Sequence, residues 1–180
     1  MNKKYAFVIA GLFIFLAASA LFTPTKTVLS ISSRKNPVKR IYSALAVQSG
    51  FVISYTHSVN KGRVHDYYVC DLENRELVLL STHFVSYGAG IPEPEEIPGA
   101  EFTALDDDYT ISNINRKMPK LVMAVGVIAD HTFAVNKPGQ SDEMLLSNFF
   151  EPQTSLIFEI KKVSPVDYWA HKLGEPNGRV

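Results

Sequence analysis

Short runs of apolar residues, rich in β-branched and aromatic side chains, recur along the chain from residue 51 onward. The longest lie at 51–56, 64–71, 76–85, 121–129, 131–135 and 155–163. Turn-forming residues separate most of them, for example at 60–62 and 136–139, and none shows a 3.6-residue apolar stripe long enough for a core helix. With two shorter runs at 102–105 and 109–111, the pattern predicts about six to eight antiparallel strands. The fold class is therefore all-β, a small antiparallel sandwich or barrel.

The run at 121–127 is apolar at nearly every position. Continuous hydrophobicity is typical of a strand covered on both faces, so we expect a central strand here. The run at 155–163 instead alternates apolar and polar residues, which indicates a strand with one wet face.

The last part of the chain predicts a short helix rather than a strand. Ser164 supplies a capping hydroxyl, Pro165 occupies the first helical position, and Asp167 places a carboxylate in the first turn. Gly174 is a stop signal, and Trp169 falls on the apolar face of this helix. We expect that face to pack on the sheet and cover an edge.

The N-terminus carries an uncharged run at 5–22, which follows Lys3 and Lys4. As a helix it reaches roughly 27 Å, enough to cross a bilayer core. It is a transmembrane anchor or, because 18–20 fits a small-x-small cleavage site, a removable signal peptide. We expect a signal peptide or anchor at 1–22, a juxtamembrane linker at 23–43 with one early strand at 28–31, and a β domain at 44–180.

Composition narrows the class of protein. The 18 basic and 18 acidic residues balance, so charge gives no support for nucleic-acid binding. Cys70 is the one cysteine, so an oxidising compartment adds no internal disulfide. Its place in a strand-like run favours a buried small hydrophobe over a reactive thiol.

Polar residues that end strand-like runs are the candidates for a site. His57 and Ser58 follow the first run, Asp66 lies in the second, and His131 opens a later one. Antiparallel pairing through the turn at 60–62 predicts that His57 and Asp66 come close, where a carboxylate would fix one imidazole tautomer and raise its pKa. His57 and Ser58 point apart if the strand persists.

A second candidate segment follows the third run. Ser86, Gly88 and Gly90 precede Pro92, where a tight bend and an anion-binding loop of bare backbone N–H groups are the two interpretations. Across both segments, four roles stay open. They are a metal site, a Ser58 nucleophile with His131 as base and Asp66 as orienter, a polar binding pocket or docking surface, and a hydrogen-bonded network that only ties strand ends together.

The motifs together resemble a bacterial and archaeal family known only as a domain of unknown function, number eighteen-fifty. The residues that carry the resemblance are His57-Ser58-Val59, Val64-His65-Asp66, the segment 84–92 and His131. The family pattern usually has Glu where this chain has Asp66. Members look like small exported or membrane-anchored proteins encoded near TRAP-type transporters of the TAXI class, which take up organic acids or amino acids.

The predicted export, the compact β domain and this resemblance together lead us to expect a non-enzymatic accessory or binding protein that assists such a transporter. It would sit at the inner membrane through residues 5–22 with its domain in the periplasm, or be free in the periplasm after cleavage. Expected partners are a transporter subunit or its periplasmic binding protein, together with a small anionic metabolite; no cofactor and no catalytic residue are assigned. The alternative is a small periplasmic hydrolase or metal-binding protein that uses His57, Asp66 and His131.

Overall fold

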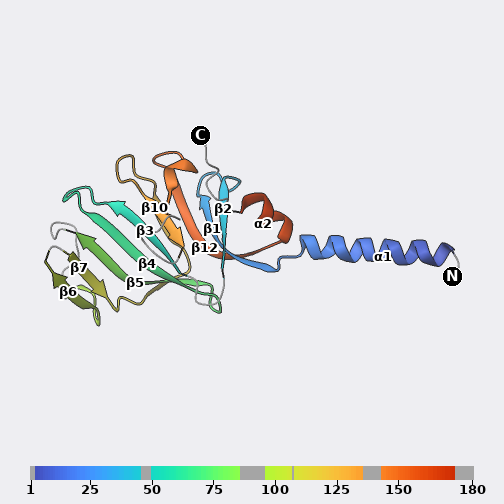
Figure 1. Cartoon of the computed structure of the whole chain (residues 1–180), viewed down its shortest axis with the longest axis horizontal. Helices are drawn as coiled ribbons and strands as arrows, with labels where there is room; N and C mark the ends of the chain where they lie inside the picture. The colour runs from blue at the N-terminus through green and yellow to red at the C-terminus, as the bar shows by residue number, and fades with distance from the viewer. Residues whose placement is uncertain (1–2, 46–49, 86–95, 107, 136–142, 173–180) are drawn as a thin grey trace.

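The computed structural model describes residues 3–45, 50–85, 96–106, 108–135 and 143–172. Strands of two antiparallel sheets form the body of the molecule, and one long helix extends away from it (Figure 1). The expected all-β sandwich with a short C-terminal helix is confirmed. Within the described residues the two sheets stay open and do not close into a barrel.

The smaller sheet has four strands in the order β2-β1-β12-β9. They are β1 (Lys26–Ser33), β2 (Arg40–Ala44), β9 (Leu121–Ala124) and β12 (Ser155–Val163). The larger sheet has eight strands in the order β11-β10-β3-β4-β5-β7-β6, with β8 paired to β5. They are β3 (Gly50–Thr56), β4 (Arg63–Asp71), β5 (Glu76–Val85), β6 (Glu101–Leu105), β7 (Asp108–Ser112), β8 (Arg116–Met118), β10 (Thr132–Val135) and β11 (Met144–Leu145).

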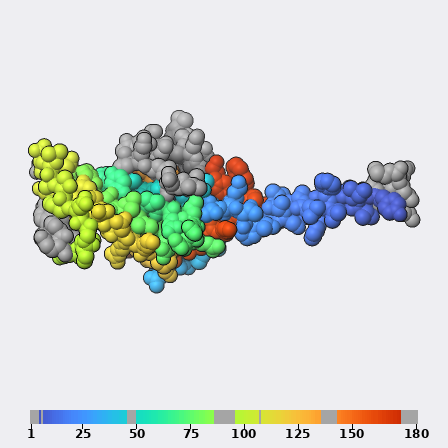
Figure 2. All heavy atoms as spheres, turned by 90° about the horizontal axis from the view of Figure 1, so that it is seen from below, coloured from blue at the N-terminus to red at the C-terminus, as the bar shows by residue number. Residues whose placement is uncertain are grey.

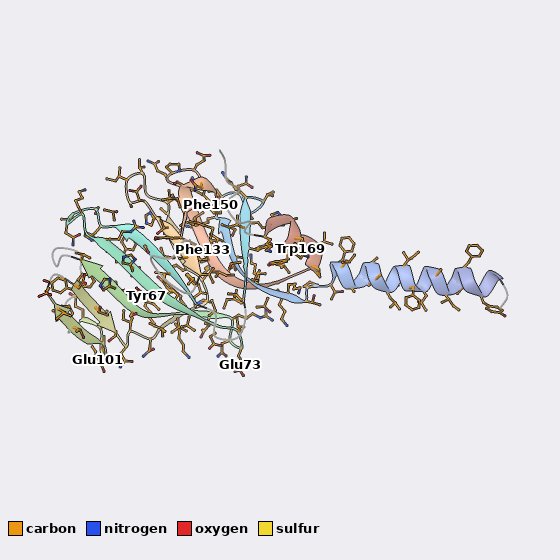
Figure 3. The ribbon with its side chains drawn as sticks, viewed as in Figure 1. Tyr67, Glu73, Glu101, Phe133, Phe150 and Trp169 are labelled. Atoms are coloured by element: carbon orange, nitrogen blue, oxygen red, sulfur yellow. The ribbon has the colours of Figure 1, made fainter. Side chains whose placement is uncertain are left out.

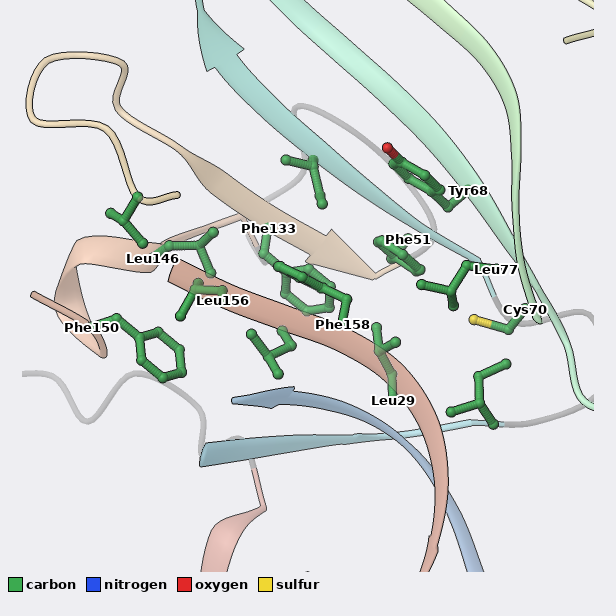
Figure 4. Close-up of a cluster of buried hydrophobic side chains, with 14 residues drawn as sticks. Leu29, Phe51, Tyr68, Cys70, Leu77, Phe133, Leu146, Phe150, Leu156 and Phe158 are labelled. Carbon is green, nitrogen blue, oxygen red and sulfur yellow. The ribbon is translucent and has the colours of Figure 1, made fainter. Parts of the chain in front are cut away.

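The main hydrophobic core lies between the two sheets (Figure 4). Phe51 of the larger sheet stacks on Tyr68 of the neighbouring strand, with ring centroids 4.8 Å apart, and on Phe158 of the smaller sheet at 6.1 Å. Cys70 is buried in the same core as a free thiol, in agreement with its expected role. Interlocking aromatic rings from both sheets therefore hold the sandwich together.

Two strand assignments differ from the sequence expectation. The early strand expected at 28–31 is present as the longer β1, a core strand in which Val28 and Ile31 are fully buried. The segment expected as a linker also contains β2, which was not expected. The apolar run at 121–127 forms only the short β9 (Leu121–Ala124), which lies at the edge of the smaller sheet instead of at its centre. The hydrophobicity of the run at 121–127 predicted a central strand. The position of a strand in a sheet, however, depends on which distant strands pair with it.

Helix α2 (Pro165–His171) begins as expected but packs through a different face. The Ser164 hydroxyl accepts a hydrogen bond from the Asp167 backbone N–H, and Pro165 opens the helix. Tyr168 packs with Val28 of β1, whereas Trp169 is 69% exposed. Figure 3 shows Trp169 on the part of the molecule nearest to α1. The expectation that Trp169 faces the sheet is therefore wrong.

Helix α1 (Lys3–Phe22) projects from the body, as the space-filling view shows (Figure 2). Its large apolar side chains are exposed on all sides, including Phe7 at 78% and Phe13 at 70%. Among the described residues, no helix combines the length and hydropathy required of a membrane span. The 3-10 helix η2 (Leu146–Asn148) completes the elements.

Candidate functional site

Asp66 is a carboxylate on the inner face of the larger sheet. Its neighbours on that face of β4, Val64 and Tyr68, are both buried. Antiparallel pairing places Asp66 opposite Ile53 of β3 and opposite Thr82 of β5, so all these side chains share one face. An acidic residue among inward-facing apolar side chains is unusual, because ionised groups are costly to remove from water.

The inner face around Asp66 is hollowed into a pocket of about 740 Å³. The residues that line it come from β3, β4, β5, β7, β8 and nearby loops: Tyr55, His57, Val64, Asp66, Leu79, Thr82, Phe84, Glu96, Ile97, Pro98, Ile111, Ile114 and Arg116. Most of this wall is apolar, and few polar groups converge on the space. That combination is typical of a small-molecule site.

The Asp66 carboxylate receives one hydrogen bond, from the Thr82 hydroxyl at 2.8 Å. Burial raises its pKa to about 6, although the Thr82 hydrogen bond opposes this shift. Burial and the Asp66 charge together raise the pKa of Tyr55 to about 12, and the same causes raise the pKa of Tyr68. Both phenols therefore stay protonated beside Asp66 at neutral pH.

A second, smaller pocket of about 280 Å³ shares Asp66 and Tyr55 with the first. Its wall is formed by Ile53, Tyr55, Asp66, Tyr68, Leu121, Met123, Ala124 and His131. The His131 ring stacks on Tyr55 with centroids 5.5 Å apart. His131 therefore lines the smaller pocket and contacts Tyr55, which lines both pockets. Among the described residues, no hydrogen bond joins His131 to Asp66.

The orientation of His131 is fixed by the backbone. Its Nδ1 atom accepts a hydrogen bond from the Gly126 N–H at 3.0 Å, so the proton of the neutral ring lies on Nε2. A Cβ atom at position 126 would lie 3.1 Å from the ring and 2.8 Å from the Ala129 Cβ, which explains why glycine fits there. Burial, followed by the charge of Arg63, lowers the pKa of His131.

His57 lies in the turn after β3 and also uses its Nδ1 atom locally. That atom accepts hydrogen bonds from the backbone N–H groups of Val59 at 3.3 Å and Asn60 at 3.5 Å. The His57 backbone pairs with Gly62 at 2.9 Å, four residues before Asp66, which corresponds to about 13 Å along β4. The expected close pair between His57 and Asp66 is therefore wrong, although both residues line the larger pocket.

The other sequence candidates lie elsewhere. Ser58 is exposed in the turn, next to the Lys61 ammonium, which donates to its backbone carbonyl. Ser86, Gly88 and Gly90 lie outside the described residues. Within the described residues, no group of three or more His, Cys, Asp or Glu side chains is arranged to hold a metal ion.

Sequence reasoning missed Tyr55 and Thr82 as site residues. Asp66 already alternates with Val64 and Tyr68 in the sequence, which indicates an inward-facing acid. Nothing local marks Thr82, because its contact with Asp66 depends on the register between β4 and β5. That register shifts at a bulge between Tyr67 and Tyr68, a feature that alternation cannot reveal.

The outer face of the larger sheet carries a separate polar cluster. His65 exchanges a hydrogen bond with Ser54 at 2.8 Å, and its ring stacks on His83 at 5.8 Å. Arg63 on the same face forms an ion pair with Glu143 at 3.5 Å. These side chains form hydrogen bonds, ring contacts and an ion pair with one another across neighbouring strands. They lie on the opposite side of the sheet from Asp66.

Comparison with known proteins gives one match. No curated protein and no solved structure matches the chain. The matched segment, residues 51–139, spans β3 to β10 and includes His57, Asp66 and His131. The match is to the model of the family described as Domain of unknown function (DUF1850), which supports the family resemblance that the sequence motifs indicate.

Proposed function

We propose that this protein is a non-enzymatic binding protein whose ligand occupies the larger pocket on the inner face of the sheet. The observation that carries this proposal is the Asp66 carboxylate, which lines a mostly apolar space of about 740 Å³. Apolar walls with a few convergent polar groups provide affinity and orientation without requiring catalytic geometry.

The polar groups around this pocket favour binding over hydrolysis or metal chemistry. His57 and His131 both use Nδ1 to accept backbone N–H groups, and they line different pockets. Asp66 hydrogen bonds to Thr82 and, within the described residues, to neither imidazole. A nucleophile, a base and an orienting acid in one hydrogen-bonded chain would favour the alternative, and these side chains do not form one.

The setting that we propose is outside the cytoplasm, at or near the inner membrane, as an accessory to a TRAP-type transporter. The apolar segment at 5–22 supports export, and the family resemblance supports the link to the transporter. A transporter subunit or its periplasmic binding protein would contact the turn that carries Ser58 and the segment 88–92, which lies outside the described residues. The role of the pocket is to hold a small molecule for that system.

Uptake measurements in a deletion strain test this proposal. Loss of the gene should impair transporter-dependent uptake, and the wild-type protein should restore uptake and co-purify with a transporter component. Leu79→Trp fills the larger pocket from β5 and should fail to restore uptake. Val78→Trp, on the same strand but the opposite face, is the matched control and should restore it.

Unchanged uptake after deletion, with no co-purified component, would contradict the accessory role. Equal rescue by Leu79→Trp and Val78→Trp would contradict the role of the pocket. Thermal unfolding of both variants shows whether each is folded before uptake is compared.

A further inference from the structure

Among the described residues, no cationic side chain forms an ion pair with Asp66 in the larger pocket. Apart from Asp66, the charged or titratable residues on its wall are Tyr55, His57, Glu96 and Arg116. Glu96 and Arg116 are exposed, and no ion pair within the described residues involves Asp66 or Arg116. Among the described residues, the neutral hydroxyl of Thr82 is the group that hydrogen bonds to the carboxylate.

An ionised carboxylate in such a wall is costly unless something compensates its charge. One hydroxyl donor replaces only part of the hydration shell that the carboxylate loses. A positive group that enters the pocket would supply the missing Coulomb attraction and hydrogen bonds at once. Aromatic rings attract cations as well, and the wall contains Tyr55.

We propose that the ligand of this pocket is a primary amine on an apolar body, with its ammonium group held by Asp66. This inference rests on the proposed function, because it identifies the chemical class of ligand for the same pocket. The apolar part of the ligand lies against aliphatic side chains such as Leu79, Ile111 and Ile114, which line the same space.

The same geometry disfavours the anionic metabolite that the sequence led us to expect. That expectation depended on the glycines at 88 and 90, which lie outside the described residues. In the described pocket, a ligand carboxylate would meet Asp66, and two like charges in a desolvated space repel. Arg116 offers an anion a site only at the exposed part of the wall.

Three probes of similar size and different charge test the inference. They are 2-phenylethylamine, 2-phenylethanol and phenylacetate, titrated into the full-length protein in detergent or nanodisc at pH 7.5 and followed by calorimetry. The amine should bind about tenfold or more tightly than the alcohol, and phenylacetate should bind more weakly than both. Asp66→Asn should reduce amine affinity to the level of the alcohol and leave alcohol affinity unchanged.

Two controls separate a specific effect of Asp66 from general damage. Asp71→Asn removes an acid at the end of the same strand, outside the residues that line the pocket, and amine affinity should change by less than about twofold. If Asp66→Asn does not fold, lowering the pH of the wild-type protein from 7.5 to 5 provides the same test. Amine affinity should then fall while alcohol affinity stays constant.

Other groups also face Asp66, and a change in the charge of any of them would alter the pH dependence of amine affinity. They are Tyr55 of β3, Tyr68 of β4, Thr82 of β5, Arg116 of β8, His131 across the smaller pocket, and His57 and Glu96 on the wall of the larger one. Burial raises the pKa of both tyrosines, so neither changes charge between pH 5 and 7.5. Amine affinity should still fall at low pH in each of three variants: His57→Gln, His131→Gln and Glu96→Gln.

The outcomes distinguish this inference from the proposed function. Equal affinity for amine and alcohol, or tighter binding of phenylacetate, would overturn the amine inference and leave a binding pocket intact. Absence of binding by all three probes, together with full rescue of uptake by Leu79→Trp, would overturn both.

Discussion

Asp66 shows how one residue acquires its properties from its surroundings. In the sequence it is one polar member of an alternating run, and in the structure it lies between the buried residues Val64 and Tyr68. Burial raises the pKa of Asp66 to about 6, above the ordinary value for an aspartate. The folded protein therefore holds a proton on Asp66 at a pH where the unfolded chain has already released it.

This difference predicts how stability depends on pH. Between about pH 4 and pH 6 the folded state binds more protons at Asp66 than the unfolded state does, so this residue makes stability fall as pH rises. A pKa near 6 corresponds to a loss on the order of 2–3 kcal/mol from pH 4 to pH 7. Asp66→Asn should abolish this contribution, as urea unfolding of both proteins at several pH values would measure.

Asp71 at the end of the same strand is the control for that prediction. Hydrogen bonds from the Asn74 side chain and backbone lower its pKa, so its contribution has the opposite sign and is lost as pH falls. Removing it with Asp71→Asn should therefore change the pH slope in the other direction. The same pH slope in wild type and Asp66→Asn would show that Asp66 is not buried as described.

At the scale of elements, the turn between β3 and β4 depends on close packing against β5. Gly62 lies where this turn meets the end of β5, and a Cβ atom there would lie 1.9 Å from the carbonyl oxygen of Val85. The contact is with backbone, which cannot move aside as the tip of a flexible side chain does. This packing holds the His57 turn over the larger pocket.

Gly62→Ala should therefore destabilise the protein by about 2 kcal/mol or more, because either the turn or the end of β5 must shift. Urea unfolding measures the change, and amide exchange should locate the loosened region at residues 57–63. Gly11→Ala is the matched control, since no atom lies within 4 Å of a Cβ at that position. Equal stability of the two variants would show that the turn is not held against β5.

At the scale of the whole molecule, two parts of different character are joined in one chain. The β body buries its aromatic residues between the sheets, whereas α1 leaves its apolar side chains exposed (Figures 2 and 4). Large exposed apolar surfaces are typical of segments that contact a membrane or another protein, and we propose such a contact for α1. Export of the body is the prediction that belongs to this scale.

A reporter fusion tests export in a bacterial host. Alkaline phosphatase joined after Val180 should be active, because the enzyme gains activity only outside the cytoplasm. Leu12→Lys combined with Phe15→Lys should abolish that activity, since each lysine costs about 3 kcal/mol at the centre of an apolar segment. Val38→Lys places the same charge at an exposed position of the body and should leave the fusion active. Activity in the double lysine variant would contradict an export role for this segment.

Local patterns in the sequence were sufficient for several features. Alternation and β-branched residues predicted strands at 76–85 and 155–163, which agree with β5 (Glu76–Val85) and β12 (Ser155–Val163). Ser164 and Pro165 predicted the start of α2, because capping depends on neighbours within one turn. These signals are local, so the sequence by itself determined where these two strands and the start of this helix form.

Only the tertiary structure decided which elements meet. Thr82 hydrogen bonds to Asp66 because β4 and β5 pair in one register, and in the docked α2 it is Tyr168 rather than Trp169 that packs with Val28 of β1. β9 is an edge strand because its partner is β12 alone. Strand order, register and docking depend on contacts between distant residues, and no single segment of the sequence contains that information.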